Sequence, residues 1–195
     1  MKIYSKEFFS SLVALAKGKR GVLFIVLLFL MPLSVHSQKI AVKTNLLEWA
    51  TISPNISAEF VVSPTMSLDL SASFNKWVPF ANAKYDHLKI QPELRYWFQR
   101  PMAQHFLGFS LLYFNYDMMA KGVCHEGQAI GGGFSYGYDF VLSRRWNLEL
   151  TAGVGAVYRF EKKYDEGTKP PSENNGNKWG IAPINLGVTL SYVIF

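Results

Sequence analysis

The sequence contains one cysteine, Cys124, in 195 residues, so no disulfide bond can form within the chain. It also has little continuous apolar sequence, because the one long apolar run is residues 22–33, VLFIVLLFLMPL. A membrane-spanning helix needs about 20 consecutive apolar residues. This run has 12, which is the length of the apolar core of a secretory signal peptide.

The segment around this run has the other features of a signal peptide. Five basic residues precede it, and Ser34 and Ser37 place small residues where cleavage before Gln38 requires them. We therefore expect residues 1–37 to be a cleaved signal peptide and residues 38–195 to be the mature protein. An uncleaved N-terminal anchor is the alternative. No cysteine stands directly after the expected cleavage site, which argues against a lipid-anchored lipoprotein.

Net charge is small once the signal peptide is set aside. Residues 1–37 hold five of the 20 Lys and Arg residues and one of the 14 Asp and Glu residues. Fifteen basic and 13 acidic residues remain, which is a net charge of +2. A chain this close to neutral lacks the basic surface of a nucleic-acid-binding protein, so no nucleic-acid partner is expected.

The mature chain does contain strict two-residue alternation of polarity, which is clearest in residues 87–98, HLKIQPELRYWF. Successive side chains of a strand point to opposite faces, so this segment predicts a strand with one charged face and one apolar face. Pro92 lacks a backbone donor, which predicts a local bulge or distortion of the strand. The pattern recurs and predicts eight strands, at about residues 39–46, 55–62, 66–75, 87–98, 104–116, 129–140, 147–160 and 178–195.

The connections between these strands differ in length. Three are long, at residues 76–86, 117–127 and 162–177, and those after the second, fourth and sixth strands are short turns. The connection after the first strand is also short, which is the one exception to the alternation. No helix is needed in the mature chain. Short turns at one rim and long loops at the other are typical of bacterial outer-membrane barrels. We therefore expect an all-β fold, an eight-stranded antiparallel transmembrane β-barrel of the outer-membrane type, reached by signal-directed export in a Gram-negative bacterium.

Alternation alone does not say which face looks inward, and a secreted soluble barrel would have the same period with the faces reversed. The polar face mixes charged side chains with glycine and serine, which suits a crowded polar lumen. The last strand closes on alternating apolar and aromatic residues and Phe195, which resembles the signal that barrel-insertion machinery reads. Aromatic residues lie near strand ends, as in membrane-interface belts: Trp49, Trp77, Tyr85, Trp97, Phe98, Trp146, Tyr158, Phe160, Trp179 and Tyr192.

The charged residues of the polar face are expected to form a structural network that fills the lumen. An eight-stranded barrel has an interior just wide enough for side chains to fill, and small residues such as Gly133 and Gly137 would face the long charged ones. We therefore expect no continuous water channel. The expected network consists of Glu59, Asp69, Glu93, Arg95, Asp139, Glu149 and Arg159.

Four segments carry a resemblance to a known family. They are residues 43–47 (KTNLL), 91–97 (QPELRYW), 135–138 (SYGY) and 142–146 (LSRRW). Together they resemble an uncharacterised family of small outer-membrane β-barrel proteins from Bacteroidota, over residues 39–195. The resemblance implies an eight-stranded membrane barrel and brings no catalytic residues.

The leading functional hypothesis is a non-enzymatic envelope protein, structural or presenting loops 76–86, 117–127 and 162–177 to a surface partner. Its expected contacts are outer-membrane lipid and the insertion machinery, with no cofactor and no metal. Adjacent side chains of an extended loop diverge, so the run Cys124, His125 and Glu126 makes a poor metal site. The alternatives are a narrow pore, a secreted soluble binding barrel, and a lipid-modifying enzyme. The enzyme would use the mature chain's histidines, of which His87 and His125, unlike His105, lie at the outer end.

Overall fold

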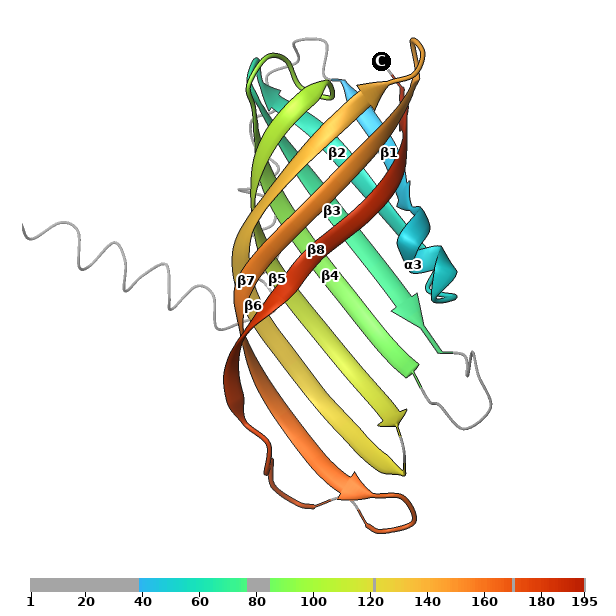
Figure 1. Cartoon of the computed structure of the whole chain (residues 1–195), viewed down its shortest axis with the longest axis vertical. Helices are drawn as coiled ribbons and strands as arrows, with labels where there is room; N and C mark the ends of the chain where they lie inside the picture. Colours follow the sequence, from blue (N-terminus) through green and yellow to red (C-terminus); the bar gives the residue numbers. More distant parts are fainter. Residues whose placement is uncertain (1–38, 77–84, 121, 170, 195) are drawn as a thin grey trace, which may run out of the picture. The chain divides into compact units, whose positions relative to one another are not determined.

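The computed structural model describes residues 39–76, 85–120, 122–169 and 171–194 (Figure 1). The expected signal peptide therefore lies outside the described residues. Each strand pairs antiparallel with the next, and the first pairs with the last, so the sheet closes into a barrel. The predicted eight-stranded antiparallel architecture is confirmed. The strands are β1 (Ile40–Asn45), β2 (Asn55–Ser63), β3 (Met66–Asn75), β4 (Tyr85–Trp97), β5 (Gln104–Ala120), β6 (Val123–Val141), β7 (Trp146–Asp165) and β8 (Lys178–Val193).

The strands differ greatly in length. β1 has six residues, whereas β5, β6 and β7 have 17, 19 and 20. The three long strands continue past the ends of β3 and β4 at the lower end of the barrel in Figure 1. We call this end, where β3, β5 and β7 finish, the loop end, and the opposite end the turn end. Among the described residues, no helix is long and apolar enough to cross a membrane.

The predicted long loop at residues 117–127 is wrong. β5 continues to Ala120 and β6 begins at Val123, with Gly122 in the left-handed region at φ +78°. The polar side chains that suggested a loop are paired in the sheet, where Asp117 lies opposite Glu126 and Glu126 opposite Lys162. The neighbouring strands supply the backbone partners that keep this segment extended.

The other two predicted loops are shorter than expected. Residues 85 and 86 belong to β4, and residues 77–84 lie outside the described part of the chain. Residues 162–165 belong to β7. A long connection remains after β7, which resumes as β8 at Lys178.

The expectation that no helix is present is also wrong, because a short helix, α3 (Leu46–Ala50), follows β1. Asn45 caps its N-terminus, accepting a hydrogen bond from the Leu47 backbone N–H at 3.0 Å. The Asn45 amide also donates to the Leu186 carbonyl of β8 at 3.0 Å. α3 therefore lies against β8 just beyond the point where β1 stops.

Pro92 interrupts the sheet as predicted. The pairs between β4 and β5 pass from Ile90–Tyr113 directly to Glu93–Ser110, without changing register. The missing N–H of Pro92 removes a donor there but inserts no extra residue. True register shifts lie elsewhere, in β2 before Ser63 and in β8, where one extra residue is inserted opposite Gly153.

Candidate functional site

The barrel interior contains a group of buried charged side chains. Glu59, Asp69 and Glu93 are directly opposite one another on β2, β3 and β4. All three are buried. Carboxylates placed side by side repel each other, so this arrangement requires cations close to all three.

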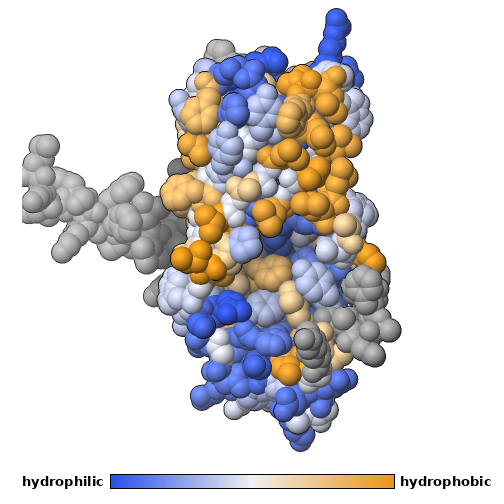
Figure 2. Space-filling model, in the orientation of Figure 1, coloured by the Kyte–Doolittle hydropathy of each residue, from blue (hydrophilic) through white to orange (hydrophobic). Residues whose placement is uncertain are grey.

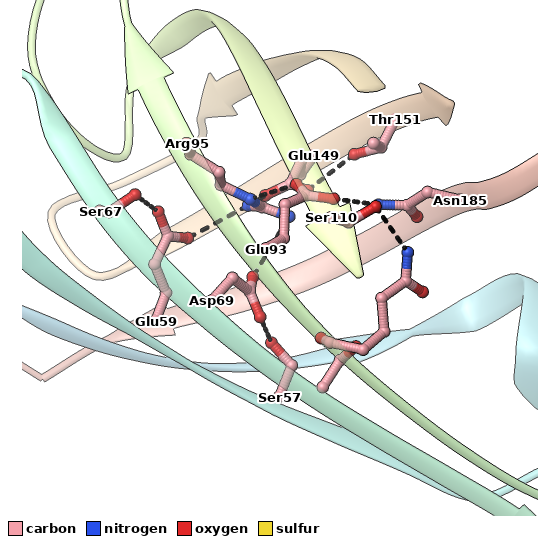
Figure 3. A network of polar contacts seen from close by, with 12 residues as sticks. Ser57, Glu59, Ser67, Asp69, Glu93, Arg95, Ser110, Glu149, Thr151 and Asn185 are labelled. Carbon is pink, nitrogen blue, oxygen red and sulfur yellow. Dashed lines mark hydrogen bonds and ion pairs between the residues drawn. The ribbon is translucent and has the colours of Figure 1, made fainter. Parts of the chain in front are cut away.

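Arg95 of β4 supplies one of these cations. Its Nε is 2.7 Å from Glu93 Oε1, and its Nη2 is 3.2 Å from Asp69 Oδ2. Its Nη1 lies 3.2 Å from Glu59 Oε2 and 2.8 Å from Glu149 Oε2. One guanidinium thus contacts four carboxylates that come from four strands (Figure 3).

Lys43 of β1 supplies the second cation. Its Nζ is 2.7 Å from Glu149 Oε2 and 3.2 Å from Asp69 Oδ2, and it also pairs with Glu59. The alternation of β1 already places Lys43 on the polar face, yet the sequence-based network omits it. The signal that could have identified it is its position as the one basic residue on the inward face of the first strand.

Neutral side chains complete the coordination of the four carboxylates. Ser67 donates to Glu59, Ser57 to Asp69, Thr151 to Glu149 at 2.7 Å and Asn185 to Glu93 at 2.8 Å. With the two cations, every carboxylate oxygen of the group therefore has a partner. We call Lys43, Glu59, Asp69, Glu93, Arg95 and Glu149 the ion-pair network. It is drawn in part in Figure 3.

Two residues of the expected network do not join it. Asp139 is buried directly opposite Glu149 but forms no ion pair among the described residues, and Asn147 Nδ2 donates to its Oδ2 at 2.8 Å. Arg159 lies at the loop end, half exposed, with Nη1 3.8 Å from Glu161 Oε2. All seven predicted residues lie on inward-facing positions, but only five of them meet.

Aromatic side chains fill the lumen on the turn-end side of the network. Trp97 and Phe106 are fully buried, with ring centroids 4.7 Å apart, and the Arg95 guanidinium lies 4.5 Å from the Phe106 ring centroid. Gly137 makes this possible, because a Cβ there would lie 2.3 Å from Phe106 Cζ. Trp97, expected in an outer aromatic belt, instead points inward and donates to Ser67 Oγ at 2.7 Å.

The three histidines occupy different environments. His87 is buried, with Nε2 3.4 Å from Ser73 Oγ, and its Nδ1 has no hydrogen-bond partner among the described residues. His105 faces outward beside Tyr136 at the turn end. His125, in β6 rather than a loop, contacts the Glu161 carboxylate inside the barrel. Ser73 and His87 could be two members of a catalytic triad. Among the described residues, however, no third group binds His87 Nδ1 to orient the ring.

Comparison with known proteins identifies the family. A family model described as "Protein of unknown function (DUF3575)" matches residues 23–194. No curated protein matches the chain. The predicted membership of an uncharacterised family is confirmed: the chain belongs to the DUF3575 family of proteins of unknown function.

Proposed function

We propose that the barrel is an outer-membrane protein of a Gram-negative bacterium, with a non-enzymatic role as an envelope anchor that presents its loop end to the exterior. The supporting observation is that every strand exposes large apolar side chains on the outside of the barrel. One example from each strand, each between 39% and 68% exposed, is Val42, Ile56, Leu70, Leu94, Phe109, Phe134, Val154 and Leu186. A surface of this kind around a closed barrel suits contact with lipid.

The outward apolar surface has a boundary near the loop end. A row of cross-strand neighbours, Tyr113, Ile130, Tyr158 and Trp179, marks this boundary. Toward the loop end, the next outward residues are Asn115 on β5 and Gln128 on β6, and both are polar and exposed. On β7 the outward face becomes polar one outward residue further toward the loop end. We call the surface on the turn-end side of this row the apolar band.

Aromatic residues also mark the turn-end boundary of the apolar band. Trp146 and Tyr192 lie with ring centroids 5.0 Å apart, and Arg145 Nη1 donates to the Tyr192 hydroxyl at 2.9 Å. Tyr and Trp at both boundaries suit the two interfaces of a membrane, because these rings are apolar with one polar edge. Figure 2 shows this apolar surface over the upper part of one face and a hydrophilic surface at the lower end.

The filled lumen supports an anchor rather than a pore. The ion-pair network and the Trp97–Phe106 pair occupy the interior over successive levels of the barrel. The cavity next to the network measures only about 50 Å³. An eight-stranded barrel packed in this way leaves no room for a continuous column of water.

We expect Leu70→Arg to destabilise the barrel in a bilayer by about 2–4 kcal/mol, the usual cost of an arginine facing lipid at mid-membrane. Leu70 points outward and is 46% exposed. Urea unfolding of the refolded protein in lipid vesicles, followed by tryptophan fluorescence, measures this cost. The matched control is Asn115→Arg, outward but beyond the apolar band, which should change stability little. Equal stability of the two variants would contradict contact between Leu70 and lipid.

Purified wild-type protein in a planar bilayer should give no steady single-channel conductance. The physical reason is the continuous packing of side chains across the lumen. Recordings at increasing protein concentration make the test, with boiled protein as the control for adventitious leakage. A reproducible unitary conductance whose frequency rises with native protein would refute the anchor and support a narrow pore.

A further inference from the structure

The polarity of β5 reverses along its length. In its first half the outward residues Leu107 and Phe109 are apolar, and Ser110 faces inward. In its second half the inward residues Phe114 and Met118 are apolar, while the outward residues Asn115 and Asp117 are polar. The sequence of β5 therefore has apolar residues on both faces. Toward the loop end, the inward side chains of β5 are thus mainly apolar.

These apolar side chains form one wall of an open pocket of about 380 Å³ near the loop end. Small-molecule pockets occupy about 300–1,000 Å³ and are lined mainly by apolar side chains, so this pocket has the size and lining for one small apolar group. Inward side chains of β5, β6, β7 and β8 form its wall. They include Leu112, Phe114, Met118, Ala129, Val157 and Ala182.

One side of the pocket borders a sheet edge. β1 pairs with β8 only as far as Thr189, so in the described part of the chain the rest of β8, toward Lys178, pairs with β7 alone. Pro183 lies on this edge and lines the pocket. Ile181, close by on the outward side, is 85% exposed and belongs to the apolar band. This edge therefore adjoins both the apolar band and the pocket.

Two cations face each other beside the pocket. Arg159 of β7 lines the pocket, and Lys178 of β8, which does not line it, is directly opposite Arg159. Like charges in directly opposite positions of a sheet destabilise it, and an anion held between them would remove the repulsion. Glu161 is a weak partner for Arg159, because their closest atoms are 3.8 Å apart.

Glu161 is engaged by other groups. The Tyr116 hydroxyl donates to its Oε2 at 3.2 Å, and His125 contacts its Oε1. Tyr116 lies beyond the apolar band, where burial and the Glu161 carboxylate raise its pKa to about 12. Its phenol therefore keeps its proton and continues to donate to Glu161 at neutral pH. Arg159 and Lys178 carry two positive charges against the one negative charge of Glu161, so these three residues together keep a net positive charge.

We propose that this pocket binds a single-chain amphiphile with an anionic headgroup. The acyl chain would lie against Phe114, Met118 and Val157, and the headgroup between Arg159 and Lys178. The pocket volume is near the lower end of the ligand range, which suits one chain rather than two. The shared chemistry is an acyl chain that ends in an anion, which both a fatty acid and a lysophospholipid provide. This binding role goes beyond that of an anchor.

Photolabelling tests the tail site. The mature protein, in phosphatidylcholine nanodiscs, is irradiated with an 18-carbon fatty acid that carries a diazirine on its chain. We expect saturable labelling of β5 and β7 peptides, competed by unlabelled oleate. Ala182→Trp, which fills the pocket, should weaken labelling at least about tenfold, or about 1.4 kcal/mol. The matched variant Ala156→Trp, on an exposed outward position, should label as wild type.

Headgroup recognition is tested with a double variant at exposed positions, Arg159→Gln with Lys178→Gln. Heat-modifiable gel mobility confirms that each variant is folded. The double variant should bind oleate about tenfold more weakly but methyl oleate, which has no charge, as wild type does. Comparing oleate with oleoyl lysophosphatidate in the wild type identifies which anion is preferred. Unsaturable labelling, equal labelling of Ala182→Trp and wild type, or equal affinity for oleate and its methyl ester would overturn the proposal.

Discussion

Replacing Arg95 with alanine should destabilise the folded barrel by about 3–5 kcal/mol, the usual effect of removing one partner from a buried ion pair. Arg95 is the cation that contacts Glu59, Asp69, Glu93 and Glu149 together. The network has four carboxylates and two cations, so the loss of Arg95 leaves Lys43 as its one cation. Burial prevents water from compensating the stranded charges.

The measurement is urea unfolding in vesicles, with Arg144→Ala as the matched control. Arg144 is exposed in the turn after β6, so its loss should change stability by less than about 0.5 kcal/mol. A double-mutant cycle separates charge from packing. Arg95 is the only cation paired with Glu93 among the described residues, so adding Glu93→Gln to Arg95→Met should recover part of the lost stability. Strictly additive effects would show that the ion pair contributes nothing, and that Arg95 acts through its packing on Phe106.

Deleting residues 192–195 should remove the protein from the outer-membrane fraction. β1 and β8 close the barrel through only five residue pairs, and the deletion removes two of them, Ala41–Val193 and Val42–Tyr192. It also removes the hydrogen bond from the Ile194 N–H to the Ile40 carbonyl, at 2.7 Å. Unpaired backbone groups in lipid cost several kcal/mol each, so the shortened seam should not hold.

Immunoblots of outer-membrane fractions, with and without boiling before electrophoresis, provide the measurement. Folded barrels resist detergent until heated and migrate differently. A deletion of equal length at residues 171–174, in the exposed connection between β7 and β8, should leave the folded form at its normal level. Normal amounts of the heat-modifiable form after deletion of residues 192–195 would contradict the role of this seam in closing the barrel.

The sequence by itself determined the strands and which side chains share a face. Alternation with period two is a local property, because each side chain of a strand points away from its neighbours. The pattern of residues 87–98 therefore placed Glu93 and Arg95 on one face and Leu94 on the other, as the structure has them. The short turns at one end, at residues 63–65, 99–103 and 143–145, followed from local Pro and Ser residues in the same way.

The tertiary structure decided how far the strands extend. Residues 117–127 read as a loop because they are polar, and they form strands because β5, β6 and β7 supply backbone partners to one another. The helix α3 fills the place where β1 stops and β8 continues. Whether a polar segment pairs depends on its neighbours in space, and no local pattern contains that information.

The tertiary structure also decided which charges meet. Lys43 and Glu149 are 106 residues apart and come within 2.7 Å because β1 and β7 both flank β8 in the closed barrel. Asp139 and Arg159 share the inward face with the ion-pair network but have other partners, Asn147 and Glu161. Alternation specifies the face of the sheet, whereas the partners of a charge depend on the register between strands. For the same reason, only the closed barrel brings Phe114, Val157 and Ala182 together around one apolar pocket.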